Sequence, residues 1–161
     1  MRYAPDGPLL RFWFRFVFPH QSVLRLIGPE RGFAEVVRPE LDASFGRCLE
    51  RLCRESLPLF YLREGVRAPS TVGEYWDADV QVDVVGVRQD NWTDLGECKW
   101  DDVPSLSALA AELDEKVRRY PNARNATIGR RLFVRKALAM ARLPDVRVHT
   151  LQDLYDLEPG S

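Results

Sequence analysis

The chain has 161 residues, of which 45% are hydrophobic and 29% are charged, and its formal net charge is −1. This length fits one globular domain with a sizeable core, and the composition excludes a disordered chain. A net charge near zero excludes attraction of the whole molecule to nucleic acid, so such binding would require local patches. We find no run of about 18 apolar residues and no signal-peptide pattern, and therefore expect a cytoplasmic protein with no membrane partner.

The first predicted element is an aromatic helix. The segment PLLRFWFRFVFP, residues 8–19, places Leu10, Trp13, Phe14 and Val17 at helical spacing between two prolines. Its phenylalanines also alternate as in a strand, but the bracketing prolines favour a helix. Aromatic side chains surround nearly the whole helix, so we expect it to be buried on several sides or to dock on another surface. We assign residues 1–40 to this helix and its connector, which contains IGPERG, and residues 41–161 to the main domain.

A second helix is predicted over SFGRCLERLCRESL, residues 44–57. Ser44 stands in the N-cap position, and one face of the helix carries Phe45, Cys48, Leu49, Leu52 and Cys53. Glu50 lies off this apolar face. It is either an ordinary solvated residue or a functional one.

A strand pair or one long strand follows in STVGEYWDADVQVDVVGV, residues 70–87. RQDN predicts a hairpin turn, and WTDLGECKW, residues 92–100, is the return strand. Strict alternation places Val80, Val82 and Val84 on one face and Gln81, Asp83 and Val85 on the other. On the return strand, Glu97 and Lys99 share a face with Leu95.

The rest of the chain alternates between helix and strand. SLSALAAELDEKVRRY, residues 105–120, predicts a helix that buries Leu106, Leu109, Ala110 and Leu113 and stops at Pro121. RRLFVRK predicts a strand, and VRVHT a strand that runs into a short terminal helix capped by Thr150. The order of elements predicts an α/β fold with a central mixed sheet flanked by helices.

Charge is unevenly distributed along the chain. Residues 74–102 hold nine acidic residues against two basic ones, whereas residues 112–147 hold ten basic residues against four acidic ones. This pattern fits a metal site beside a phosphate-binding surface, and equally two halves that pair with each other. The candidate nucleic-acid-binding residues are Arg118, Arg119, Arg124, Arg130 and Arg131.

The candidate catalytic group combines Asp83 with Glu97 and Lys99 of the partner strand. Two carboxylates and the main-chain carbonyl of Cys98 form a set of hard oxygen ligands suited to Mg²⁺ or Mn²⁺. Such an ion would polarise a phosphate oxygen and bind the attacking water, while Lys99 would position that water or stabilise developing charge. Glu50 would hold a metal-bound water or a second ion. The alternative is a cross-strand charge cluster that faces solvent and contributes little to stability.

An acid followed by E-x-K on the next strand resembles the PD-(D/E)xK nucleases, the superfamily of restriction enzymes and Holliday-junction resolvases. LLRFWFRFVFP, FGRCLERLC, VQVDVVGV and LGECKW, in this order, further resemble the C-terminal domain of a family of archaeal and bacterial P-loop ATPases. The resemblance covers approximately residues 3–135 and implies a restriction-endonuclease-like sheet. It assigns the family's helix glutamate to Glu50, its strand aspartate to Asp83, and its E-x-K pair to Glu97 and Lys99.

Two departures from that family are visible. Gln81 stands where the family usually places a glutamate two residues before the aspartate, which removes one anionic oxygen. No G-x-x-x-x-G-K-[ST] motif occurs, so we expect no ATP hydrolysis.

Our leading hypothesis is a Mg- or Mn-dependent nuclease domain that hydrolyses phosphodiester bonds of DNA, with branched and single-stranded DNA among the candidate substrates. The alternative is a weak or inactive nuclease-fold module that binds DNA or docks on protein. In that role the aromatic N-terminal helix would mediate homodimerisation or attachment to an ATPase.

Overall fold

The computed structural model describes residues 8–136 and 143–157. The chain divides into two compact units, of which one ends at Ser44 and the other begins at Phe45. Among the described residues, no helix is both long enough and apolar enough to cross a membrane.

The N-terminal unit is helical through all of its described residues, as the spacing in residues 8–19 predicts. A kink at Gly28, whose φ of 80° is in the left-handed region, precedes Pro29 and marks the predicted connector, which is otherwise helical. The elements are α1 (Pro8–Phe12), a π-helical turn (Trp13–Val17), a 3₁₀ turn (Phe18–His20), α2 (Gln21–Gly32) and a second π-helical turn (Phe33–Val37).

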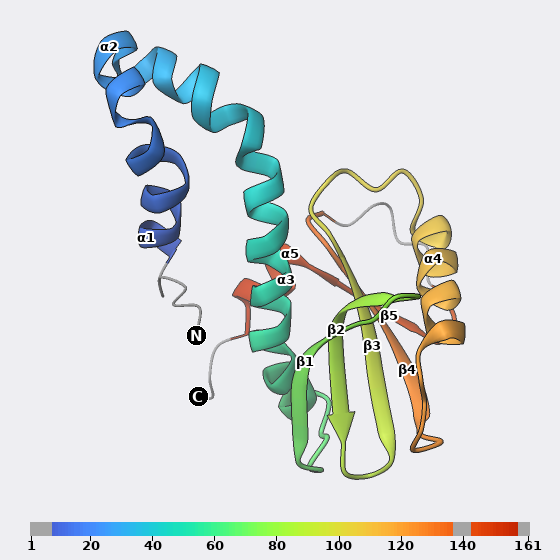
Figure 1. The fold of residues 1–161 in the computed structure, drawn as a ribbon. Coiled ribbons are helices and arrows are strands. Elements are labelled where there is room, and N and C mark those ends of the chain that lie inside the picture. Colours follow the sequence, from blue (N-terminus) through green and yellow to red (C-terminus); the bar gives the residue numbers. More distant parts are fainter. Residues whose placement is uncertain (1–7, 137–142, 158–161) are drawn as a thin grey trace. The chain divides into compact units, whose positions relative to one another are not determined.

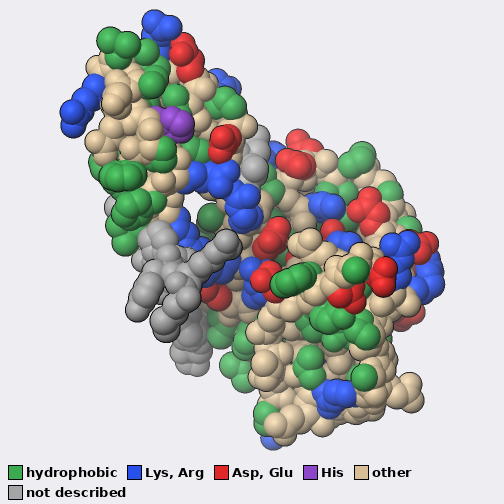
Figure 2. All heavy atoms as spheres, viewed as in Figure 1, with side chains coloured by type: hydrophobic (Ala, Val, Ile, Leu, Met, Phe, Trp, Pro, Cys, Tyr) green, Lys and Arg blue, Asp and Glu red, His purple; other side chains and the backbone are tan. Residues whose placement is uncertain are grey.

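Few aromatic side chains of this unit are buried. Phe16 and Val37 are buried, whereas Phe14 and Phe18 are exposed and Leu26 is 86% exposed. Figure 2 shows hydrophobic side chains at the surface of this unit. The described part of the unit therefore presents apolar surface of the kind that marks interaction sites in soluble proteins.

Helix α3 (Arg38–Arg63) is longer than the predicted residues 44–57 in both directions. Ser44 lies inside the helix, so the prediction that it caps the N-terminus is wrong. Its buried residues include Leu49 and Cys53 of the predicted face and also Leu57, Phe60 and Tyr61, whereas Cys48 is exposed. The predicted face is therefore right for Leu49 and Cys53 and wrong for Cys48, and the buried face continues to the end of the helix.

The second unit contains a five-stranded mixed sheet in sequential order, β1-β2-β3-β4-β5. Pairing is antiparallel from β1 to β3 and parallel from β3 to β5. Helices α3 and α4 lie on opposite faces of the sheet (Figure 1), which confirms the predicted α/β fold. The bounds are β1 (Ser70–Trp76), β2 (Gln81–Arg88), β3 (Trp92–Lys99), α4 (Leu106–Arg119), β4 (Thr127–Val134), β5 (Val146–Thr150) and α5 (Leu151–Tyr155).

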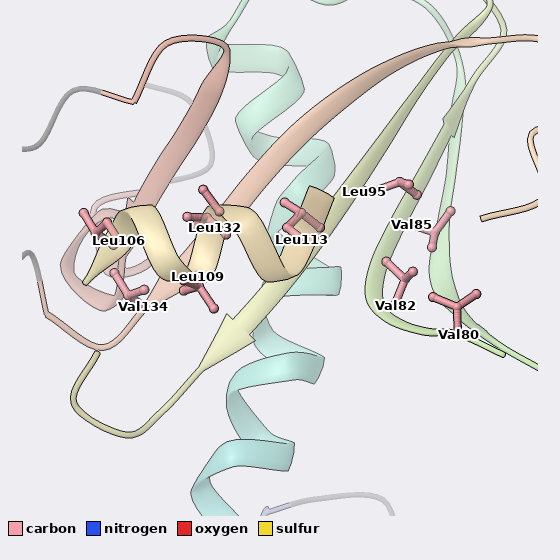
Figure 3. Close-up of a cluster of buried hydrophobic side chains, with 10 residues drawn as sticks. Val80, Val82, Val85, Leu95, Leu106, Leu109, Leu113, Leu132 and Val134 are labelled. Atoms are coloured by element: carbon pink, nitrogen blue, oxygen red, sulfur yellow. The ribbon is translucent and has the colours of Figure 1, made fainter. Parts of the chain in front are cut away.

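Each face of the sheet carries its own hydrophobic cluster. Leu106, Leu109 and Leu113 of α4 pack against the sheet, as predicted, together with strand residues that include Leu95 and Leu132 (Figure 3). The other cluster joins the buried face of α3 to Val84, Cys98 and Phe133. Both clusters remove large apolar side chains from water, which is the main contribution to the stability of this unit.

Helices α4 and α5 both begin at polar cap residues. The Ser105 hydroxyl accepts from the Ala108 amide at the start of α4. Thr150 forms a capping box with Asp153 at the start of α5, as the sequence predicts.

Strand β2 does not alternate regularly. Val82 and Val85 both pack in the α4-side cluster, whereas Val84 packs in the α3-side cluster. The pairing with β1 is irregular over the same residues, because Gly73 pairs with Val85 and Tyr75 with Val82. The predicted common face for Val82 and Val84 is therefore wrong, since an extra residue in one strand moves the following side chains to the other face.

A buried ionic network connects the end of α3 to three strands. Arg131 of β4 is 1% exposed and donates through both terminal nitrogens to Glu64 at 2.7 Å and through Nε to Asp94 Oδ1 at 2.9 Å. The Tyr61 hydroxyl donates to the other Asp94 oxygen at 2.7 Å. Buried charges are tolerated when they are paired and hydrogen-bonded, which is the arrangement here.

His149 of β5 completes this network. Its ring lies 4.1 Å from the Phe60 ring and 5.1 Å from the Phe133 ring, and its Nε2 accepts from Arg131 Nη1 at 3.2 Å. Burial, and then the positive charge of Arg131, lower the pKa of His149 to about 4. The ring is therefore neutral in the folded protein at neutral pH.

Stability should fall between pH 6.5 and 4 because of His149. In that range the unfolded chain binds a proton that the folded chain excludes, so the free energy of unfolding decreases as pH falls. A shift from 6.5 to about 4 corresponds to about 3 kcal/mol. Urea unfolding across this range, compared with His149→Gln, isolates the effect because carboxyl groups titrate in both proteins. His20→Gln, at an exposed histidine, is the control; equal pH dependence of His149→Gln and the wild type would contradict the prediction.

Gly86→Ala should destabilise the protein by about 1–3 kcal/mol. A Cβ at Gly86 would overlap the Tyr61 hydroxyl and lie 2.8 Å from Leu57 Cδ2. Gly73→Ala in neighbouring β1 is the matched control, since a Cβ there meets nothing within 4 Å. Urea unfolding should show a loss for the first variant only, and an equal effect of both would disprove the close approach of α3 to β2.

Candidate functional site

Asp83 lies where the pairing between β2 and β3 stops. The last paired residues at this end are Val84 and Gly96, and beyond them the Asp83 Oδ2 accepts from the Cys98 amide at 3.0 Å. Arg54 of α3 donates to the Asp83 carbonyl at 2.8 Å. The carboxylate thus replaces a main-chain acceptor, which holds it next to the backbone of Cys98.

Glu97 of β3 is 3% exposed and contacts two lysines. Its Oε2 accepts from Lys116 of α4 in a short contact, and its Oε1 lies 3.4 Å from Lys99 Nζ. Lys99 also lies 3.6 Å from Glu112. The predicted E-x-K pair is therefore a real contact on the α4 face of the sheet.

The charge of Asp83 acts on two glutamates, Glu97 and Glu50. Burial, and then the charge of Asp83, raise the pKa of Glu97, and Lys116 and Lys99 only partly offset this. Burial and Asp83 likewise raise the pKa of Glu50 on α3. Asp83 therefore lies within electrostatic range of both glutamates.

Lys99 is held in its charged form. Burial disfavours the charged amine, but Glu97, Glu112 and Asp83 outweigh this effect and raise the pKa of Lys99. A charged lysine beside two carboxylates can donate to an anionic ligand, but it cannot act as a base.

The described residues fit a divalent cation that has few protein ligands, and not one that protein side chains enclose completely. Within residues 8–136 and 143–157, no three side chains of His, Cys, Asp or Glu form a metal-binding group. Mg²⁺ commonly takes only one or two carboxylates and completes its shell with water and substrate phosphate. Asp83, Glu97 and the backbone of Cys98 match that pattern, although a cation would compete with two lysines for Glu97.

The Cys98 thiol takes no part in this group. A hydrogen bond with Cys53, and burial, raise the pKa of the Cys98 thiol well above its ordinary range, so it remains neutral. It packs in the α3-side cluster.

The predicted phosphate-binding surface needs one correction. Arg131 is buried, and its donors are used by Glu64, Asp94 and His149, so we remove it from that surface. Arg118 pairs with Glu115, and Arg130 lies 2.9 Å from Asp114. Arg119 and Arg124 are exposed. Figure 2 shows basic and acidic side chains interspersed on this unit, so the local excess of positive charge is smaller than the sequence suggests.

The two oppositely charged halves of the sequence partly pair with each other. Lys116 contacts Glu97, Arg131 contacts Asp94, and Arg135 Nη2 lies 2.8 Å from Asp102. This is the second of the two interpretations that the charge distribution left open.

Two residues near the acids were not selected from the sequence. Arg54 fixes the backbone of Asp83, and Lys116 pairs with Glu97. Lys116 carries a weak signal, because it is one of only three lysines and follows the buried Leu113 by three residues on α4. Arg54 carries none, since its partners, the Asp83 carbonyl and the Glu74 carboxylate, lie on strands far from it in the sequence.

Comparison with known proteins identifies a family. The model of DUF234, described as archaea bacterial proteins of unknown function, matches residues 13–116. This is more than half of the chain, and the protein therefore belongs to that family. The matched range includes Glu50, Asp83, Glu97 and Lys99, whereas β4 and β5 lie outside it. No curated protein and no solved structure matches significantly.

Asp83→Asn should lower the pKa of Glu97, because it removes the charge that raises it. The amide oxygen still accepts from Cys98, so the local structure is kept. Lys116→Gln should raise the pKa of Glu97 instead. The ¹³C shift of the Glu97 carboxyl group during a pH titration measures both effects, with Asp79→Asn as an exposed control. Shifts of the same sign in the two variants would contradict the proposed coupling.

Proposed function

We propose that this DUF234 protein is a metal-dependent nuclease-type domain that hydrolyses phosphodiester bonds of DNA. The observation that carries the proposal is the charge coupling of Asp83 to Glu97 and Glu50 at the splayed end of the β2–β3 pair. Like charges kept close together cost stability, and they are typical of sites whose purpose is binding or catalysis.

Asp83 and Glu97 would hold Mg²⁺ or Mn²⁺ together with the carbonyl of Cys98. When bound, such an ion supplies Lewis acidity to a phosphate oxygen and makes water a better nucleophile. Lys99 is charged and part-exposed, which suits it to orient a water or to stabilise charge on the phosphate. Glu50, a half-buried carboxyl group on α3 whose pKa is raised by burial and by Asp83, is suited to bind a water near the ion.

Lys99 is the lysine that a cation would displace from Glu97. It already has Glu112 as a second partner at 3.6 Å, and its side chain is more exposed than that of Lys116. Moving Lys99 toward Glu112 frees one Glu97 oxygen while Lys116 keeps the other. The phosphate-binding residues would be Arg118 and Arg119 near the end of α4, which are exposed. Arg124 contacts the Arg88 carbonyl at 3.2 Å, at the other end of β2 from Asp83.

A non-catalytic nuclease-fold module is the second candidate. Gln81 replaces an acid, and Glu97 is neutralised by two lysines, both of which weaken the attraction for a metal ion. In this role the exposed apolar residues of the N-terminal unit would dock on a second copy of the chain or on an ATPase.

The protein should be assayed with Mn²⁺ on branched, single-stranded and duplex DNA. Asp83→Asn and Lys99→Gln should each lower the cleavage rate at least about 100-fold, because several kcal/mol of transition-state stabilisation depend on these residues. Asp79→Asn, an exposed Asp-to-Asn change near β2, should cleave normally. Gel assays with end-labelled DNA measure the rates.

Undiminished cleavage by Asp83→Asn would refute the proposed mechanism. DNA binding that needs no metal and gives no product would favour the DNA-binding module. If the protein neither cleaves nor binds DNA, and if its self-association is lost in Trp13→Ala, the docking module would be favoured.

A further inference from the structure

A second site lies at the hairpin end of the sheet, at the opposite end of β2 from Asp83. A cavity of about 540 Å³ opens where β2 ends and where β3, β4 and β5 begin. Its lining includes Arg88, Trp92 and Asp94 of the hairpin and Gly129, Arg130 and Arg147 of the parallel strands. Cavities of this volume hold small-molecule ligands in other proteins. None of these side chains belongs to the Asp83–Glu97 group.

The inner wall of the cavity is rigid. Both Asp94 oxygens already accept, from Arg131 and from Tyr61. Glu64 accepts from Arg131 and, in a short contact, from Arg147. The Asp94 carboxylate is therefore already paired with donors of the protein. Arg147 lines the cavity with a side chain that is 56% exposed, so a ligand can still reach it.

Gly129 keeps the cavity open. A Cβ at this position would lie 3.1 Å from the Asp94 carboxyl carbon and closer still to its Oδ1. A side chain would therefore displace Asp94, so only glycine leaves both the ionic network and the cavity intact.

Arg88 carries the signal for a ligand. Its side chain is only 12% exposed, and its guanidinium lies 5.4 Å from the Tyr61 ring centroid and 5.6 Å from that of Trp92. It pairs with Asp90 and lies 3.7 Å from Asp94 Oδ2, and its buried Nε finds no hydrogen-bond partner among the described residues. A guanidinium whose donors are not all used favours an anion beside it.

The remaining features indicate the ligand's chemistry. The lining has three arginines against two aspartates, Asp94 and Asp145, which favours an anion. Trp92 is 41% exposed, so part of its ring is accessible for stacking. Guanidinium groups beside an accessible aromatic ring are the elements that bind a phosphate with its base.

We infer that this cavity binds a nucleotide, with its phosphate on Arg88 and Arg147 and its base against Trp92. The nucleotide is either free or an unpaired nucleotide of a strand. This inference goes beyond the proposed nuclease function, because it requires neither a metal ion nor Asp83.

Isothermal titration calorimetry in EDTA tests the inference with four probes: inorganic phosphate, adenosine 5′-monophosphate, and a ten-nucleotide single strand with and without a 5′-phosphate. Saturable binding of the mononucleotide, at least about 10-fold tighter than that of phosphate, is expected because stacking adds to the phosphate contacts. Binding of the strands but not of the mononucleotide would support the same site with a strand as the source. Saturable binding of none of the probes, or equal affinity for phosphate and nucleotide, would overturn it.

Variants locate the binding. Trp92→Leu and Arg147→Gln should each weaken it about 10-fold or more, and both positions are exposed enough for the variants to fold, which circular dichroism checks. Trp76→Leu, at a 73% exposed tryptophan of β1, and Asp83→Asn should bind normally. Retained affinity in both Trp92→Leu and Arg147→Gln would overturn the inference. Loss of nucleotide binding in Asp83→Asn would also overturn the inference, because it would place the nucleotide at the Asp83 site. Loss of DNA cleavage alone in that variant bears only on the proposed function.

Discussion

The hydrogen bond from the Cys98 amide to the Asp83 carboxylate is the contact on which the candidate site depends. The β2–β3 pairing stops at Val84 and Gly96, so the next main-chain donor needs another acceptor. Asp83 provides one, and its charge is thereby kept at the edge of the pairing, within range of Glu50 on α3 and Glu97 on the α4 face. The irregular register of β2 with β1 occurs at the same residues. Irregular strands often re-aim a side chain next to a functional site, and here the side chain is an acid.

The two buried charged groups of the sheet differ in how their charges are balanced. Arg131 has opposite charges around it, and both Asp94 oxygens and both Glu64 oxygens accept from it or its neighbours. Such a fully paired network can hold α3 against β3, β4 and β5 without further partners. Glu97 and Glu50 instead lie within range of the charge of Asp83, and burial adds to the cost of ionising both glutamates. In the proposed metal site, a bound cation would offset this cost.

Most of the fold could be predicted because local signals agreed with the tertiary structure. The period of α4, the turn between β2 and β3, and the Thr150 cap each act within a few residues. The errors have non-local causes. Val82 and Val84 face opposite sides of the sheet because the pairing of β2 with β1 is irregular. Helix α3 begins at Arg38, before Ser44, because the residues that precede Ser44 are also helical. Arg131 looked like one of several surface arginines, and only the fold brings Glu64 and Asp94 to it. For the site, Asp83, Glu97 and Lys99 followed from spacing, but Lys116 and Arg54 come from helices whose packing the sequence does not specify.

In the proposed metal site, two features lower the affinity for a cation. Lys99 and Lys116 pair with Glu97, and the residue at position 81 is a neutral glutamine. Lys116 and Lys99 neutralise Glu97 when no cation is bound, and they therefore lower the cost of keeping Glu97 near Asp83. The same neutralisation means that a cation must replace at least one ammonium group, so its net gain is smaller than the negative charge of the acids implies. A glutamate at position 81 would add charge that no lysine balances, whereas glutamine leaves the local charge closer to neutral. In the proposed site, two acids combined with a moderate local charge suit an ion brought in together with a phosphate group more than one held permanently by the protein.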